Sequence, residues 1–204
     1  MKKKQLDQSL SSRLAGLYKY MEEAYDGVAR QLSFSCQGCP DNCCDSFFLH
    51  HTYIEWAYLW EGLNLFAEEK RLEVVARAAG YVKQSEADFA RGERPQILCP
   101  LNEEGRCILY SHRMMICRMH GVPSSFMRPD GKGMEFPGCF RCQGLVADVE
   151  ETPRVDRTRL YLELAALESE FLDHRRHVLP KVKKTLAQMI VFGPPQVPVM
   201  CGSD

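Results

Sequence analysis

Apolar residues recur every three or four positions in four stretches of the chain, a spacing that places them on one face of an α-helix. Three of the stretches are long and span residues 5–32, 65–91 and 153–180, and the fourth spans residues 181–192. Such stripes are typical of helices that pack against a core. The pattern therefore predicts three long helices and a short last one.

Capping residues indicate where helices begin and end. Thr52 stands three residues before Glu55, which is the spacing of a capping box, and Gly62 is the expected end of the helix that follows. Thr152 and Pro153 mark the expected start of the third long helix, because proline suits the first helical position. Together these signals predict four to five helices.

Residues 93–145 lack this periodicity. The segment holds five cysteines and five prolines, and its stretch "VPSSFMRPDGKGMEFPG" predicts a loop or a short hairpin. An irregular segment of ~50 residues is unusual in a compact domain unless something else organises it. We expect a metal to be that organiser.

The expected fold is mainly α, with four to five helices forming a scaffold around an irregular, cysteine-rich metal-binding region. We expect a single domain over residues 1–204. Its predicted parts are a metal-binding core at 34–145, flanking helices at 1–33 and 151–192, and a flexible tail at 193–204.

Composition and charge restrict the class of protein. The chain has 204 residues, 45% of them hydrophobic, and a formal net charge of −1, so no overall field favours nucleic acid or a membrane surface. No apolar run approaches the ~20 residues that span a bilayer, and the N-terminal lysines precede no apolar signal segment. We therefore expect a cytoplasmic protein, whose thiols are kept reduced.

Nine of the ten cysteines fall in two groups, and Cys201 lies apart in the tail. Two C-x-x-C motifs stand out, at Cys36/Cys39 and Cys139/Cys142. This spacing lets two sulfurs reach one ion while the backbone amides between them stabilise the thiolates. The candidate metal ligands are Cys36, Cys39, Cys43, Cys44, Cys99, Cys107, Cys117, Cys139 and Cys142.

The adjacent pair Cys43–Cys44 suggests more than one metal ion, because successive side chains diverge and seldom share one ion. Nine thiols suffice for two four-ligand sites with one left over. They equally suffice for a four-cysteine iron–sulfur cluster together with a zinc site or a reactive thiol.

Basic and imidazole side chains crowd the segment around Cys107 and Cys117. Four thiolates on one metal centre carry net negative charge, which nearby guanidinium groups offset. We expect Arg113 and Arg118 to serve the cofactor in this way. His112 and His120 are further candidate ligands.

The cysteine pattern resembles the YkgJ-type cysteine-cluster family, described as a zinc- or iron-chelating domain, which includes proteins labelled Fe–S oxidoreductases. The resemblance covers about residues 34–145. It departs from the family where three residues separate Cys39 from Cys43, and where Met114 replaces a proline, so that the segment before Cys117 is expected to be helical. The match lies on Cys36, Cys39, Cys43, Cys44, Cys99, Pro100, Leu101, Gly105, Cys107, Tyr110, Arg113, Cys117 and Arg118.

The resemblance implies a protein that binds zinc or iron. The number of thiols, the Cys43–Cys44 pair and the nearby arginines favour an iron–sulfur cluster (4Fe–4S) over Zn²⁺, with a redox or group-transfer role and a redox protein as partner. The alternatives are a zinc-organised structural or binding module, and a metal-trafficking protein without catalysis. No separate catalytic set stands out, so enzymatic activity stays open, with an Fe–S oxidoreductase-like protein as one form of it. Nucleic acid and membrane are not expected partners.

Overall fold

Two compact units make up the part of the chain that the computed structural model describes, residues 2–36 and 43–197. Unit 1 combines the residues up to Ser11 with Cys44–Arg113 and the chain from Glu168 onward. Unit 2 combines Ser12–Cys43 with Met114–Leu167. Each unit is therefore built from segments that are far apart in the sequence. The expectation of a single domain stays a prediction.

Unit 1 is built around three helices, which are α2 (Tyr53–Leu63), α3 (Glu68–Ala90) and α7 (Leu186–Val191). Helix α3 packs against α7. The indole N–H groups of Trp56 and Trp60 both donate to the carbonyl of Met189 at 3.0 Å, which ties α2 to the last turn of α7. The predicted helices over 65–91 and 181–192 are thus confirmed with shorter bounds.

The start of α2 has the predicted capping residues and one more that was not predicted. The Thr52 hydroxyl accepts the backbone N–H of Glu55, and its own proton goes to the Glu55 carboxylate at 2.7 Å. The free N–H groups of Tyr53 and Ile54 donate to the Glu168 carboxylate at 3.0 and 2.8 Å. Three of the first N–H groups of α2 therefore have side-chain acceptors.

Short elements complete unit 1. They are the pair β1 (Lys2–Lys3) and β7 (Gln196–Val197), the hairpin β2 (Asn102–Glu103) and β3 (Arg106–Cys107), and the 3₁₀ turns η2 (Tyr110–His112) and η3 (Arg176–Val178). Because β7 pairs with β1, the first residues of the expected tail are held in an antiparallel ladder. Residues 198–204 lie outside the described part.

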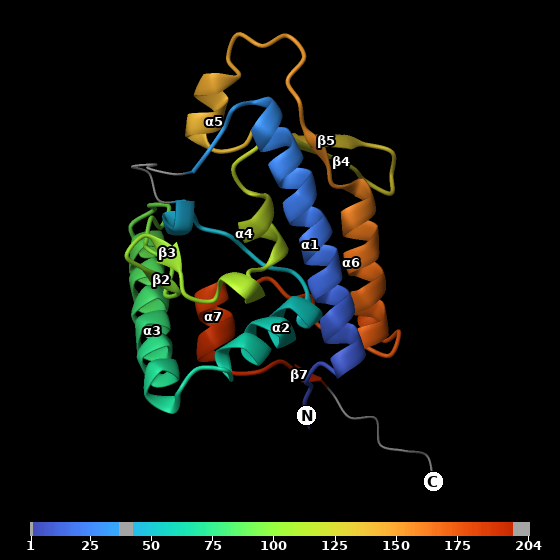
Figure 1. The fold of residues 1–204 in the computed structure, drawn as a ribbon. Coiled ribbons are helices and arrows are strands. Elements are labelled where there is room, and N and C mark those ends of the chain that lie inside the picture. The colour runs from blue at the N-terminus through green and yellow to red at the C-terminus, as the bar shows by residue number, and fades with distance from the viewer. Residues whose placement is uncertain (1, 37–42, 198–204) are drawn as a thin grey trace. The chain divides into compact units, whose positions relative to one another are not determined.

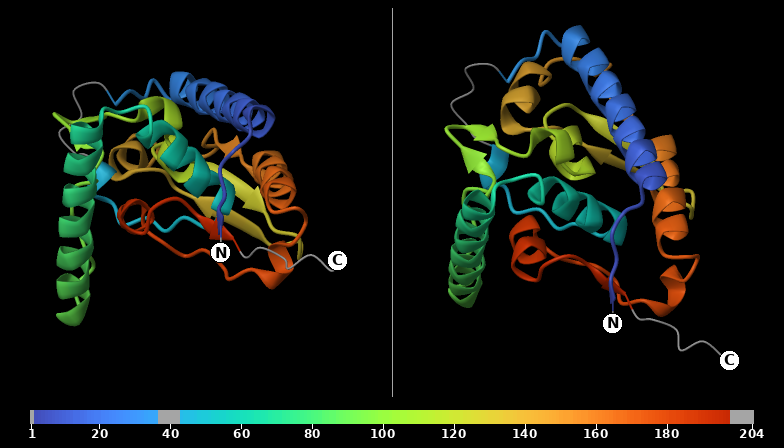
Figure 2. Two further views of the ribbon diagram at one scale, coloured as in Figure 1. Left: turned by 90° about the horizontal axis from the view of Figure 1, so that it is seen from below. Right: turned by 60° about the horizontal axis from the view of Figure 1, so that its bottom comes forward.

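Unit 2 contains most of two long helices and two short ones. Its helices are α1 (Gln8–Gln31, from Ser12 on), α4 (Met115–Met119), α5 (Phe140–Leu145) and α6 (Thr158–Phe171, up to Leu167). Helix α1 lies beside α6 (Figures 1 and 2). The apolar stripe predicted for α1 is buried at Leu14, Leu17, Met21 and Val28, so this helix is confirmed.

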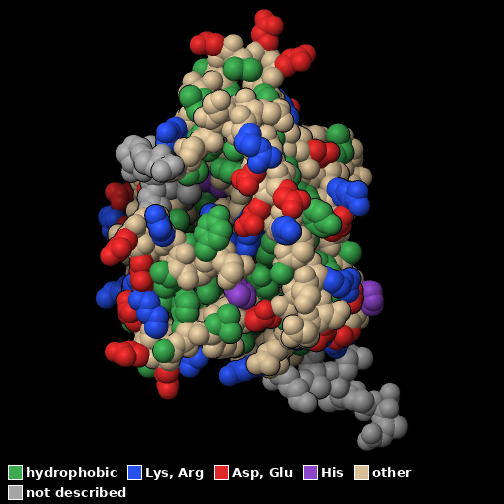
Figure 3. All heavy atoms as spheres, viewed as in Figure 1, with side chains coloured by type: hydrophobic (Ala, Val, Ile, Leu, Met, Phe, Trp, Pro, Cys, Tyr) green, Lys and Arg blue, Asp and Glu red, His purple; other side chains and the backbone are tan. Residues whose placement is uncertain are grey.

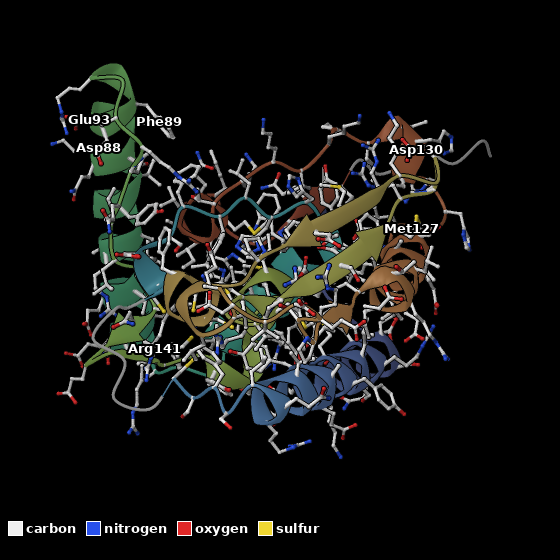
Figure 4. The ribbon with its side chains drawn as sticks, turned by 90° about the horizontal axis from the view of Figure 1, so that it is seen from above. Asp88, Phe89, Glu93, Met127, Asp130 and Arg141 are labelled. Carbon is white, nitrogen blue, oxygen red and sulfur yellow. The ribbon has the colours of Figure 1, made fainter. Side chains whose placement is uncertain are left out.

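A small three-stranded sheet lies in unit 2, in the order β5-β4-β6. Strands β4 (Ser124–Met127) and β5 (Gly133–Phe136) form the predicted hairpin, with Met127 and Asp130 toward its tip (Figure 4). Strand β6 (Val155–Asp156) pairs parallel to β4. Helix α4 contains Cys117, as expected from Met114 in place of a proline.

The predicted start of the third long helix at Thr152 and Pro153 is wrong. Helix α6 begins at Thr158, because Val155 and Asp156 join the sheet and Asp156 caps the helix, accepting the N–H of Thr158 at 2.9 Å. The helix also ends earlier than predicted, at Phe171. Asp173 and His174 there adopt the left-handed conformation that ends helices.

The fold of the described residues is mainly α, with seven α-helices and strands of two to four residues. Among the helices in residues 2–36 and 43–197, none is long and apolar enough to cross a membrane.

Candidate metal centre

The motif Cys139–Cys142 lies at the start of α5 in unit 2. Cys139 is the residue before the helix, and Cys142 lies within its first turn with no exposed surface. The two residues between them, Phe140 and Arg141, are exposed. One side of the short helix therefore carries the inner thiol, and the other side faces water.

The thiol of Cys36 lies near this motif, after the end of α1. The pKa of the Cys142 thiol is raised to about 11, first by burial and then by the proximity of Cys139 and Cys36. Tyr25 of α1 places its hydroxyl 3.9 Å from the Cys36 sulfur. Thiols from both C-x-x-C motifs are thus within electrostatic reach of Cys142.

Two glycines set the backbone beside Cys139. The N–H of Cys139 donates to the carbonyl of Gly121 at 3.0 Å. Gly138 has φ +84°, and a Cβ at this position would lie 2.5 Å from the same carbonyl oxygen. Gly121, at φ +131°, approaches Tyr25 so closely that a Cβ would lie 2.3 Å from its hydroxyl. Only glycine fits this close approach at both positions.

Cys117 is held in unit 2 by the anchoring of α4. The Arg118 guanidinium pairs with Glu22 of α1 and lies 4.6 Å from the centre of the Tyr18 ring. From the other side, buried Arg157 donates to the Met119 carbonyl at the end of α4. The Arg118 charge is therefore partly offset by Glu22, and its expected role toward a cofactor stays a proposal.

Three candidate thiols lie in unit 1. The N–H of Cys99 donates to the carbonyl of Cys44 at 2.9 Å, which joins two cysteine-bearing loops. Cys107 lies in the β2–β3 hairpin, opposite Asn102. Burial, together with the nearby Cys99, raises the pKa of Tyr81 to about 12. The β2–β3 hairpin and the hydrogen bond between Cys99 and Cys44 thus bring Cys44, Cys99 and Cys107 into one unit.

Arg113 and His112 also lie in unit 1. The Arg113 guanidinium lies 5.0 Å from the centre of the Tyr110 ring, and Tyr110 is exposed. The His112 ring packs against Tyr58 at a tilt of 33°, with centroids 4.4 Å apart, and lies over α2 at Gly62. A Cβ on Gly62 would lie 2.5 Å from the His112 Cγ, so this glycine serves a close approach inside α2 and does not end the helix.

The cysteine sulfurs are suitable ligands for a soft metal, but the described residues do not form a complete set of ligands around one ion. Thiolates favour zinc, Cu(I) and iron–sulfur clusters. Within residues 2–36 and 43–197, no three Cys, His, Asp or Glu side chains are placed to hold one metal ion. Cys39 and Cys201 lie outside those residues, as does the side chain of Cys43.

The sequence predictions did not include the residues that shape this site, which are Tyr25, Gly121, Gly138 and Arg157. The two glycines could have been identified from the sequence, because each stands within a few residues of a candidate ligand in an irregular segment. Tyr25 and Arg157 could not, since their contacts join segments far apart in the chain.

Comparison with models of known families, with curated proteins and with solved structures found no significant match. The resemblance to the cysteine-cluster family therefore stays a prediction that depends on the cysteine pattern.

Proposed function

We propose that this is a cytoplasmic metal-binding protein whose clustered cysteines hold an iron–sulfur cluster or zinc, in a redox or group-transfer role. One observation carries the proposal. In unit 2, Cys36 of the first C-x-x-C motif and Cys139 of the second both lie near enough to the buried Cys142 to raise the pKa of its thiol. Two such motifs converging is the usual way in which a chain assembles four thiolates around one metal centre.

The first ligand group in this proposal is Cys36, Cys39, Cys139 and Cys142. Burial of Cys142 favours metal binding over an isolated thiolate there, because a buried negative charge requires a positive partner. Gly121 and Gly138 fix the backbone of Cys139, which limits the reorganisation needed to bring the sulfurs together. A bound iron–sulfur cluster would supply one-electron chemistry, and bound zinc would supply a Lewis acid or a structural centre.

The other candidate ligands divide between the units. Cys44, Cys99 and Cys107 lie in unit 1, and Cys117 lies in unit 2 with the backbone of Cys43. In the proposal, those of each unit hold a second metal ion or complete a cluster within their own unit, or leave one thiol free to react. Arg113 and Arg118 offset the charge of the thiolates.

A zinc-organised structural module is the second candidate. Two backbone hydrogen bonds between loops favour it. The hydrogen bonds Cys99 N–H to Cys44 and Cys139 N–H to Gly121 both lie at candidate ligands, in segments with strands of only two to four residues. Metal binding stabilises most where regular structure is scarce. Burial of Cys142 also suits a closed structural site.

Purification without oxygen, followed by metal analysis and a visible spectrum, tests the proposal. An iron–sulfur protein is expected to be brown, to contain iron and acid-labile sulfide, and to bleach in air. Colourless protein with about two zinc ions per chain would instead establish the structural module. A folded chain that neither contains nor takes up stoichiometric metal would contradict both.

A further inference from the structure

The outer half of α5 carries large apolar side chains that face water. Phe140 is 89% exposed and Leu145 is 52% exposed. At ~100° per residue, positions 140, 141, 144 and 145 fall within one arc of about 140°, and position 142 lies outside it. Phe140 and Leu145 therefore lie on the outer side of the helix, with the charged Arg141 between them (Figure 4), and Cys142 is turned inward.

This exposure reverses the usual arrangement of a surface helix, which turns its apolar side chains toward the core. Among the described residues, Phe140 makes no aromatic or cation–π contact, and Val149 in the next turn is a further 43% exposed. Large exposed apolar side chains rimmed by polar residues commonly mark interaction sites. We call Phe140, Leu145 and Val149 the α5 patch.

Acidic residues border the α5 patch. Asp148, Glu150 and Glu151 are exposed, and none of them forms an ion pair with another described residue. Acidic side chains gather around this loop at the top of Figure 3. The whole chain has a formal net charge of only −1, so the negative charge of this loop is a local feature and not an excess of acidic residues over the whole surface.

We propose that the α5 patch is the docking site of a protein partner whose contact face is apolar at its centre and rich in Lys and Arg at its rim. Charge complementarity identifies the rim, because unpaired carboxylates favour a basic surface and disfavour an acidic one. Phe140 supplies the aromatic anchor that dominates many interfaces. The patch is small, so the complex is transient and weakens as salt screens the charges.

The α5 patch lies at the second C-x-x-C motif, so docking there would bring a partner next to the candidate metal centre. Phe140 and Arg141 are the two residues between Cys139 and Cys142, so a partner docked here contacts the outer side of the second C-x-x-C motif, opposite the buried Cys142 thiol. This inference goes beyond the proposed function, because it concerns a surface and holds whichever metal the thiols bind.

Selection from a phage-displayed library of random peptides, against the full-length chain at low salt, tests the proposal. The selected peptides are expected to combine an aromatic or aliphatic residue with flanking Lys or Arg. Measured by fluorescence anisotropy, their Kd should rise at least about tenfold in Phe140→Ser. It should rise similarly in the double variant Glu150→Lys/Glu151→Lys, and in high salt.

Matched variants on α3 provide the control. Leu72→Ser removes another exposed apolar residue, and Glu69→Lys/Glu86→Lys reverses two other exposed charges. These variants should bind the selected peptides as the unmodified chain does. Equal binding to Phe140→Ser, or a selection without basic and apolar enrichment, would overturn the proposal. Metal content is measured on the same samples, so a failure of metal binding is recognised separately.

Discussion

Gly138 shows how a single residue without a side chain shapes the candidate metal centre. Its φ of +84° belongs to the left-handed region, and its Cα faces the Gly121 carbonyl so closely that a Cβ would lie 2.5 Å from the oxygen. The same carbonyl accepts the N–H of Cys139. Both the conformation and the close approach therefore determine where the Cys139 thiol lies.

We predict that Gly138→Ala lowers the free energy of unfolding by about 2–4 kcal/mol, because backbone strain adds to a steric overlap. The metal content per chain should fall with it. Gly131→Ala is the matched control, since Gly131 has φ +80° with nothing within 4 Å of a Cβ. It should cost only about 1 kcal/mol. Equal losses in chemical denaturation would show that the contact with Gly121 has no role.

At the scale of elements, Glu168 joins α6 to the start of α2. Its carboxylate accepts the N–H groups of Tyr53 and Ile54, and Arg176 lies 3.6 Å away. Burial raises the pKa of Glu168, and the two backbone hydrogen bonds oppose that rise. The negative charge also suits the positive end of the α2 dipole.

Glu168→Ala is expected to lower the free energy of unfolding by about 2–4 kcal/mol, since two buried N–H groups lose their acceptors. Glu168→Gln keeps one acceptor oxygen and should lose about half as much. On the same helix, Glu163→Ala breaks only the exposed pair with Arg159 and should cost under about 0.5 kcal/mol. Urea denaturation measures all three, and a loss in Glu168→Ala no larger than that in Glu163→Ala would refute the capping role.

Elements that depend on local sequence were predictable, and those that depend on distant pairing were not. The stripe of α1 and the N-cap at Thr52 are local patterns, and both are confirmed. The start of α6 was misplaced because Val155 pairs with Ser124, a contact that no local propensity reveals. The candidate ligands were visible in the sequence, but the approach of Cys36 to Cys142 depends on the fold.

At the scale of the whole molecule, the chain distributes its candidate ligands over two units. Cys36, Cys117, Cys139 and Cys142 belong to unit 2, and Cys44, Cys99 and Cys107 belong to unit 1. Cysteine spacing could not predict this division, because neighbouring Cys43 and Cys44 fall in different units. We propose above all that both C-x-x-C motifs ligate one metal centre in unit 2.

Thiol protection tests that claim most directly. Cys36 is exposed, so N-ethylmaleimide should modify it rapidly in metal-depleted protein, whereas Cys142 is shielded by burial. In the metal-loaded chain, peptide mass spectrometry should find Cys36, Cys39 and Cys139 protected together, while Cys201 still reacts. Removal of the metal by a chelator should restore the reactivity of all three. A Cys36 that reacts equally fast with and without metal would contradict the account.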